Sequence, residues 1–432
     1  MRFLLQPEKR VRVSNSNINQ NKLNNIWFAG IYYVPVVLAY VLNMFFEFVR
    51  PGVFATLCMI LVAVELVLRK QINLKMFTDR LVAAYFIYNS LSVIWLVRGG
   101  LPARVYLQEY VVSLLPVIFY YVGRTCNNET DGEGKELGFY RFFIYACLII
   151  GALGIVLQIV MPQFYIDYSY KMLFVSKADA STCRVRMDSV VGCTVLGSIS
   201  VTAMLAAIPF IMEKKLRVFG IIAMVINLVV AFMSNQRSAM VVALIVIVYF
   251  NYLIFFQYKI FEKKYFYYEL AALAALFVML CLVRMDAVLK IYYRLVSLPG
   301  AVSERSEQWI AAVNNMYSTW LGNGLGANGH KALFIEGTHV IADGGLVKMY
   351  CEEGVFGFSM FIYILILTAR RGMTNVKKYC VELGIIAIAL LQSIGSNILA
   401  FQLTTPVFWF AIGRIFADAM VNNDIKSEIK EK

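Results

Sequence analysis

One polar interval, from residue 286 to residue 345, contains both histidines of a chain that is otherwise dominated by apolar stretches. His339 lies just before Asp343, where apolar sequence resumes, so its imidazole could act as a general base or bind phosphate as a cation. A histidine in a polar loop is more often simply solvated, and His330, which follows a run of glycines, matches that description better. A polar segment of this length is costly between membrane spans unless it folds over something, which makes it the expected functional centre.

An amphipathic helix is expected within this interval, with Ser303 as its N-cap. Its apolar stripe would consist of Trp309, Val313, Met316 and Trp320. Arg305 lies four residues before Trp309 on the same stripe, so a helix at the membrane interface would direct its guanidinium inward. A simple membrane-surface anchor would show the same pattern and is nearly as well supported.

The glycine-rich segment 321–330 follows this helix and reads LGNGLGANGH, which contains a formal G-x-G-x-x-G. A dinucleotide site is excluded because no strand precedes the motif and no βαβ unit surrounds it. The glycines are instead expected to form a tight backbone turn, or a nest that binds an anion.

The elements that position these residues must be membrane helices, because 60% of the chain is hydrophobic and only 16% is charged. The net charge of +13 comes from short basic clusters between apolar runs, so it reflects membrane topology rather than a nucleic-acid partner. We expect an all-α bundle of about twelve transmembrane helices in a single domain, residues 1–432, with residues 286–345 as one large outer loop that carries short amphipathic helices. The candidate spans lie near residues 26–48, 52–68, 81–97, 105–122, 139–161, 189–212, 217–233, 239–257, 266–285, 346–368, 381–398 and 402–419.

Two further expectations concern the ends and the cysteines of the chain. The polar, basic arm before the first span indicates an uncleaved anchor rather than a signal peptide. The eight cysteines include no CxxC pair and lie mostly within or beside spans, so we predict neither a metal site nor a disulfide framework, and no cofactor.

Basic residues occur in every second loop, which predicts an even number of spans with both termini in the cytoplasm. The outer loops then contain Arg184 and Arg186, and also Arg237 in the turn 234–238. An arginine at the end of a span usually reaches lipid phosphate. For Arg237 a functional role is favoured, because so short an outer turn has no need of an arginine and lies at the depth of a lipid pyrophosphate. For Arg184 and Arg186 the two interpretations are balanced.

Two adjacent carboxylates, Glu352 and Glu353, lie just below the outer interface, where an unpaired charge is costly. Lys348 is four residues before Glu352 and is the expected partner. Polar lining of a cavity is the alternative.

These motifs together resemble the O-antigen polymerase and O-antigen ligase superfamily, over the region from about Arg184 to the tenth span. The resemblance is carried by Ser234-Asn235-Gln236-Arg237-Ser238, by Glu304-Arg305 with Trp309, by Leu321-Gly322-Asn323-Gly324-Leu325-Gly326, by His339, and by Glu353-Gly354-Val355-Phe356-Gly357. Val340 stands where the ligases usually have asparagine, which weakens the case for a ligase.

The resemblance implies a membrane glycosyltransferase at the outer face of the bacterial cytoplasmic membrane. It would polymerise undecaprenyl-pyrophosphate-linked repeat units without nucleotide sugar or metal, in O-antigen, capsule or exopolysaccharide synthesis. A chain-length regulator and a flippase would be further partners, besides the membrane lipid.

The candidate residues would then have different roles in the reaction. Arg237 and Arg305 would hold the leaving pyrophosphate, because guanidinium groups stay charged and bind two oxygens. The acceptor hydroxyl would lose its proton to His339, or to Asp343 or Glu353. Arg184, Arg186 and Glu353 are the expected substrate-binding residues.

Three other functions remain open at this point. A ligase would move the same glycan to a lipid A core. A transporter would carry lipid-linked sugar or an ion, although transporters tend to place their charges at the bilayer midplane rather than at one face. An assembly subunit would have no chemistry.

Overall fold

The computed structural model describes residues 15–125, 138–172, 186–296, 298–333 and 335–430, and within these ranges it contains helices and no β-strand. The first half consists of α1 (Asn15–Asn43), α2 (Pro51–Leu68), α3 (Phe77–Leu91), α4 (Val93–Arg98), α5 (Ala103–Glu109), η1 (Tyr110–Leu114), η2 (Leu115–Val117), α6 (Ile118–Arg124), α7 (Gly138–Val160), α8 (Pro162–Met172) and α10 (Cys193–Met212). The second half consists of α11 (Arg217–Met233), α12 (Arg237–Asn251), η4 (Tyr252–Gln257), α13 (Lys263–Val296), α14 (Leu298–Asn314), η5 (His330–Ala332), α15 (Gly345–Met373), α16 (Val376–Gly395), η6 (Ile398–Ala400) and α17 (Thr405–Lys430). The expected all-α class is confirmed.

Nine helical stretches among the described residues are long and apolar enough to cross a membrane, so the protein is a multi-pass helical bundle. Three of them are composite, since α3 with α4 covers 77–98, α5, η1, η2 and α6 together cover 103–124, and α12 with η4 covers 237–257. Within a helical segment the backbone N–H and C=O groups bond to one another, as they must in a bilayer core that contains no water to pair with them.

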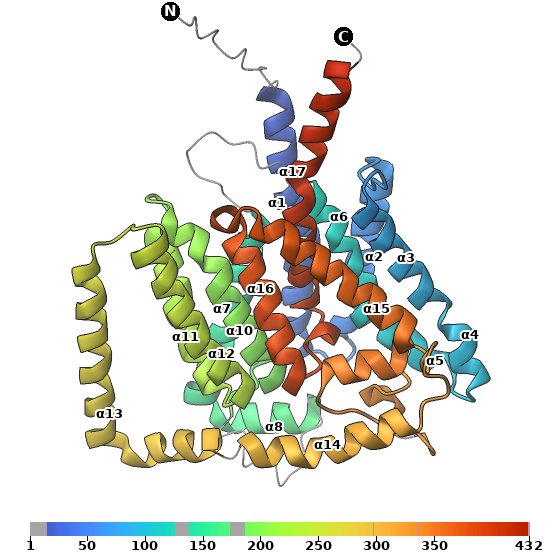
Figure 1. The fold of residues 1–432 in the computed structure, drawn as a ribbon. Helices are drawn as coiled ribbons and strands as arrows, with labels where there is room; N and C mark the ends of the chain where they lie inside the picture. Colours follow the sequence, from blue (N-terminus) through green and yellow to red (C-terminus); the bar gives the residue numbers. More distant parts are fainter. Residues whose placement is uncertain (1–14, 126–137, 173–185, 297, 334, 431–432) are drawn as a thin grey trace, which may run out of the picture.

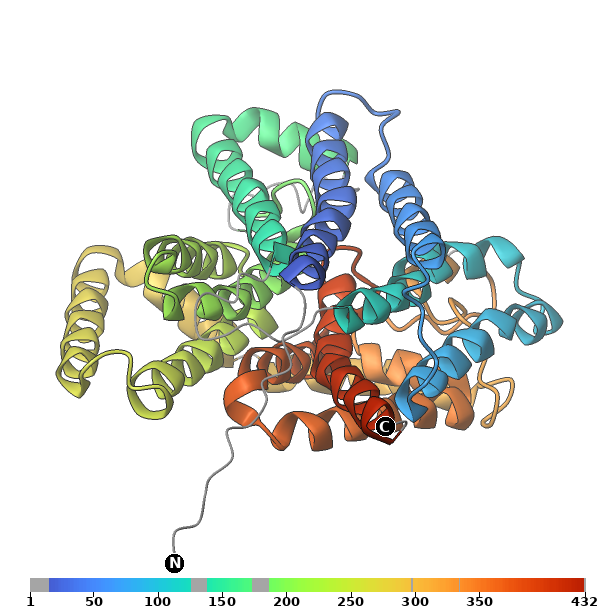
Figure 2. The same cartoon turned by 90° about the horizontal axis from the view of Figure 1, so that it is seen from above.

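The bundle has two distinct ends (Figure 1). α1 begins and α17 ends at one of them, whereas α8 and α14 lie across the opposite end. Seen from above, α16 and α17 occupy the middle, with α2 to α5 on one side and α11 to α13 on the other (Figure 2). The candidate residues of the polar interval are therefore carried at the end of the bundle away from the chain termini.

The core of the bundle is centred on α10, of which 83% is buried inside the protein. It packs against α7, α11, α12 and α16. By contrast, only 28% of α2 is buried, and its outward face presents apolar side chains such as Leu57 and Leu61. This is the arrangement expected when lipid rather than water surrounds the bundle.

α6 and α17 cross with their backbones in contact at a pair of glycines. A methyl group built on Gly413 would overlap the carbonyl oxygen of Tyr120, and one built on Gly123 would overlap that of Phe410. Small residues at such crossings allow helices to approach closely in membranes. Beside this crossing, Arg124 pairs with the buried Asp79 at 2.9 Å and so joins α6 to α3.

Replacing Gly413 with alanine is therefore expected to push α17 away from α6. We expect a loss of about 1–3 kcal/mol of stability, the usual range for overpacking, and a lower unfolding temperature of the purified protein in detergent. Gly30→Ala in α1 is the matched control, because its added methyl would lie 3.9 Å from the nearest atom, on Phe142. Equal unfolding temperatures for the two variants would contradict this account of the crossing.

The polar interval differs from expectation in its helices. α13 continues to Val296, and α14 begins at Leu298, so Ser303 lies inside the helix and is not its N-cap. The inward face of α14 is formed by Trp309 and Ala312, whereas Val313 is exposed. Met316 packs against Ala312 from just beyond the end of the helix at Asn314, and Trp320 lies further along the chain.

Candidate functional site

The break between α16 and η6 brings several distant segments together. α16 ends at Gly395, and Ser396 is fully extended. The Ser396 hydroxyl is held at 2.9 Å by Gln236 Nε2, and its carbonyl accepts a 3.3 Å hydrogen bond from the backbone N–H of Gly345. Asn397 Nδ2 donates to the carbonyl of Ile341 at 3.0 Å. The start of α12, the end of the polar interval and the start of α15 therefore meet here.

Arg305 and Asp343, two of the predicted catalytic residues, form an ion pair, with Arg305 Nη2 at 2.6 Å from Asp343 Oδ2. The two side chains are 29% and 34% exposed, so the pair is half-buried and accessible from outside the bundle. Trp309 Nε1 donates to the Asp343 carbonyl at 2.7 Å and fixes the backbone beside the pair. Arg305 and Trp309 thus lie on the same side of α14, as their spacing predicted, and the guanidinium of Arg305 points toward the bundle.

Arg305 also lies close to the start of α12, where Arg237 is the first helical residue. A methyl group built on Gly395 would be 3.7 Å from Arg305 Nη1 and 4.0 Å from Cβ of Ser238. Arg237 itself is half-buried. The positive φ of 49° at Asn235 closes the tight turn that leads into this helix. Gly395 therefore separates the first turn of α12 from the Arg305–Asp343 pair.

The segment that contains Arg186 runs beside the same turn. The backbone N–H of Met187 donates to the carbonyl of Met233 at 2.9 Å, at the end of α11. Asp188 Oδ1 accepts from the backbone N–H of Cys193 at 2.9 Å and so caps the start of α10. Arg186 is half-buried next to these contacts. Arg184, the other predicted substrate-binding arginine here, lies outside the described residues.

Both histidines are exposed, and they are placed differently. The carbonyl of His339 accepts a 2.7 Å hydrogen bond from Asn328 Nδ2, so its backbone is fixed by the glycine-rich segment. Within the described part of the chain, no hydrogen bond or ion pair joins its imidazole to Arg305 or Asp343. His330 begins η5, and its side chain is near enough to Glu109 to interact with it electrostatically.

The glycine-rich segment 321–330 forms backbone hydrogen bonds with α15 at a break in this helix. Gly354 interrupts this helix with φ 65° and ψ −172°. The backbone N–H groups of Asn323 and Gly324 donate to the carbonyls of Cys351 and Glu352 at 2.8 and 2.9 Å, and that of Val355 donates back to the carbonyl of Thr319 at 2.9 Å. The predicted tight turn is present, and the N–H groups of Asn323 and Gly324 serve the protein's own carbonyls rather than an anion.

Buried charges line α15 just after its start. Lys348 pairs with Glu352 at 3.7 Å, as the four-residue spacing predicted, and also contacts Glu109. Glu109 additionally accepts from the hydroxyl of Ser113. Glu353 is 3% exposed and accepts a 2.7 Å hydrogen bond from the hydroxyl of Tyr85. Glu353 thus lies near Lys348, and its hydrogen bond to Tyr85 does not connect it to the Arg305–Asp343 pair.

Glu109, Tyr85 and Ser113 were not identified from the sequence. Tyr85 and Glu109 come from spans more than 230 positions away from their partners on α15, and Ser113 reaches this group only through Glu109. One signal was available, because an acidic residue inside an apolar span is rare and marks a paired or functional position. Glu109 is such a residue within the span 103–124.

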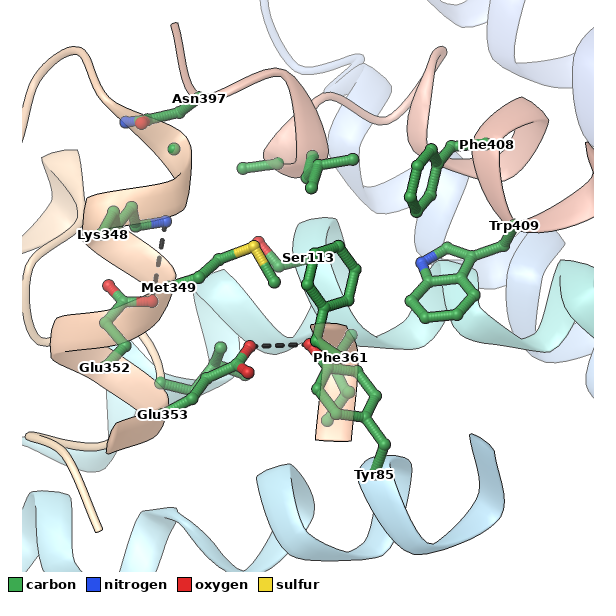
Figure 3. A pocket seen from close by; sticks show the side chains of 15 residues that line it. Tyr85, Ser113, Lys348, Met349, Glu352, Glu353, Phe361, Asn397, Phe408 and Trp409 are labelled. Atoms are coloured by element: carbon green, nitrogen blue, oxygen red, sulfur yellow. Dashed lines mark hydrogen bonds and ion pairs between the residues drawn. The ribbon is translucent and has the colours of Figure 1, made fainter. Parts of the chain in front are cut away.

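A small pocket lies between α15 and α17 (Figure 3). One wall carries the polar side chains of Lys348, Glu352 and Glu353, and the opposite wall carries the rings of Phe408 and Trp409. Gly345 and Asn397 also line it, so the cavity begins next to the break at Gly395.

The described residues contain no group of three or more His, Cys, Asp or Glu side chains placed to hold a metal ion. Cys58, Cys147, Cys193, Cys351 and Cys380 are free thiols. No protein-family model matches the chain, and no curated protein matches it in a sequence search. A functional assignment therefore depends on the geometry and on the resemblance of short motifs.

Proposed function

We propose that this protein is a membrane glycosyltransferase that polymerises lipid-pyrophosphate-linked oligosaccharide repeat units. The observation that carries the proposal is the meeting of three segments at Gly395. Arg305, held by Asp343, and the first turn of α12, which begins with Arg237, lie on two sides of this glycine. They do so at the end of the bundle opposite the termini, beside a cavity.

The chemistry needs positive charge where a pyrophosphate leaves. The acceptor hydroxyl attacks the anomeric carbon, the bond between that carbon and the pyrophosphate oxygen breaks, and its electron pair goes to the pyrophosphate. Guanidinium groups at a half-buried position offset this charge better than they would in water. Arg305 and Arg237 supply them, Arg186 and Arg184 assist in substrate binding, and Asp343 positions Arg305. The acceptor proton passes to His339, or to Asp343 or Glu353.

The topology belongs to the same proposal. Twelve spans are supported by the nine long helices of the described residues, the two shorter apolar helices Arg217–Met233 and Thr405–Ala417, and α13, which contains the predicted span 266–285. Both termini face the cytoplasm, and residues 286–345 form the outer loop of a single domain in the bacterial cytoplasmic membrane. The common position of α1's start and α17's end in Figure 1 supports an even number of crossings.

A ligase that transfers the glycan to a lipid A core is the second candidate, since it needs the same donor site. Val340, which follows His339, favours the polymerase. The loss of the long-chain ladder with one repeat unit retained identifies a polymerase in a gene-deletion strain, whereas loss of all surface glycan identifies a ligase.

Arg237→Ala and Arg305→Ala are expected to abolish long chains while the protein remains in the membrane. The measurement is the glycan ladder on a gel from the deletion strain complemented by each variant, with membrane levels checked by immunoblot. Arg98→Ala, at an exposed position at the end of α4, is the control and should retain the ladder. Wild-type chain length in both arginine variants would refute the proposal.

A further inference from the structure

α14 presents different kinds of side chain on its different sides. Trp309 and Ala312 face the bundle. The residues that follow them, Ile310 and Val313, are apolar and exposed. Gln308 is exposed as well, and because successive helical residues are about 100° apart, it lies on the opposite flank of α14 from Ile310. The helix therefore has a bundle side, an apolar flank and a polar flank.

Exposed apolar side chains continue beyond the end of α14 at Asn314. Tyr317 and Trp320 are 58% and 60% exposed, as much as Ile310 on the helix at 59%. We call Ile310, Val313, Tyr317 and Trp320 the apolar ridge. Large apolar side chains gathered in this way are unfavourable in water and mark a surface that binds an apolar partner.

Trp320 joins the apolar ridge to a surface of α15 that faces lipid. The ring centroids of Trp320 and Phe356 are 5.4 Å apart. Phe356 lies just after the break at Gly354, and the helix beyond it exposes Tyr363 and Ile366 on the same face. An exposed apolar face on a membrane span lies against lipid rather than water. The ridge therefore continues a surface that the bilayer already covers.

The residue types of the ridge suit the boundary between lipid and water. Tryptophan and tyrosine concentrate at this boundary, because each combines an apolar ring with a polar N–H or O–H group. α14 lies across the end of the bundle that is opposite the chain termini (Figure 1). A helix in this position with one apolar and one polar flank has the character of an interfacial membrane helix.

We propose that the apolar ridge is embedded in the lipid leaflet at this end of the bundle and that the lipid contact holds α14 at the membrane boundary. The contact follows from the geometry alone. Its consequence for Arg305 rests on the proposed function. Arg305 lies on α14 one turn before Trp309 and pairs with Asp343, so a helix held at the boundary keeps the guanidinium at the depth of lipid phosphates.

The first test measures tryptophan fluorescence of the full-length protein in phosphatidylcholine nanodiscs. The lipid carries bromine, which quenches tryptophan on contact, either near the glycerol end or near the methyl end of its acyl chains. Trp320→Phe should lower the quenched fraction of the signal, and more so with bromine near the glycerol end. Trp409→Phe is the matched control and should raise this fraction, because Trp409 is buried in the bundle and lipid does not reach it.

The second test introduces the same charged residue on either flank of α14. Ile310→Asp should lower the unfolding temperature in nanodiscs and weaken the quenching of Trp320, because a carboxylate is costly in an apolar environment. Gln308→Asp is the matched control and should change neither property, since Gln308 is exposed on the polar flank. Should Ile310→Asp fail to fold, the comparison of Trp320→Phe with Trp409→Phe decides.

An unchanged quenched fraction in Trp320→Phe would overturn the lipid contact, and so would equal unfolding temperatures for the two aspartate variants. In the glycan ladder, Ile310→Asp should lose long chains and Gln308→Asp should retain them. A complete ladder from a folded Ile310→Asp variant would overturn the role of the contact in placing Arg305. Lipid quenching of Trp320 together with intact ladders in Arg237→Ala and Arg305→Ala contradicts the polymerase alone, whereas lost ladders without such quenching contradict the lipid contact alone.

Discussion

If the protein is the polymerase that we propose, replacing Arg305 with lysine is expected to lower the rate of chain elongation by about 100-fold, close to the effect of removing one donor from a preorganised anion site. The change keeps the positive charge, so a purely electrostatic role would predict a small effect. A lysine ammonium is a point charge, however, and cannot contact Asp343 and two phosphate oxygens in one plane as a guanidinium can. The ion pair at 2.6 Å already occupies one edge of the Arg305 fork and leaves Nη1 beside Gly395.

The measurement is the time course of polymer formation in membranes supplied with lipid-linked repeat units. Arg98→Lys is the matched control, since Arg98 is exposed at the end of α4. Asp343→Asn should reduce the rate less than Arg305→Lys, because its amide oxygen still accepts a hydrogen bond from the guanidinium. A rate for Arg305→Lys within a factor of two of the wild type would exclude bidentate binding.

Replacing Lys348 with methionine is expected to have the largest effect on stability. Lys348 is 4% exposed and is the cation that contacts both Glu109 and Glu352. The substitution leaves the carboxyl groups of Glu109 and Glu352 buried together without the lysine ammonium group. Breaking a buried ion pair in this way costs about 3–5 kcal/mol of stability. The unfolding temperature of the purified protein in nanodiscs should fall accordingly.

A second substitution separates charge from packing in this prediction. Adding Glu109→Gln to Lys348→Met should recover part of the lost stability, because it removes one of the two stranded charges. A defect of packing alone would give no such recovery. Lys331→Met, at an exposed position in η5, is the matched control and should leave the unfolding temperature unchanged.

The sequence predicts most reliably what depends on local spacing. Helical periodicity predicted the Lys348–Glu352 pair, and it placed Arg305 on the face of α14 that also carries Trp309, because both relationships lie within one helical turn. The membrane bundle followed from the length and apolarity of the spans. Helix ends were less predictable, as the start of α14 at Leu298 rather than at Ser303 illustrates.

The contacts that assemble the site could not be predicted in this way. The sequence predicts Arg305 and Asp343 as site residues, but their pairing depends on the path of the chain between α14 and α15. The break at Gly395 was hidden because the polar residues Ser396 and Asn397 fell at the end of a predicted apolar span, 381–398, whose mean hydropathy conceals them. Glu109 reaches Lys348 only through the packing of two spans.

The interrupted helix α15 has a consequence for how the protein enters the membrane during synthesis. Its first turns carry Lys348, Glu352 and Glu353 and a backbone broken at Gly354, so on its own this segment is a poor substrate for insertion into lipid. The groups that pair with these charges and with the carbonyls of Cys351 and Glu352 come from Tyr85, Glu109, Asn323 and Gly324. All four precede α15 in the chain, so they have already been translated when α15 leaves the ribosome. The order of synthesis thus supplies each polar partner before the segment that needs it.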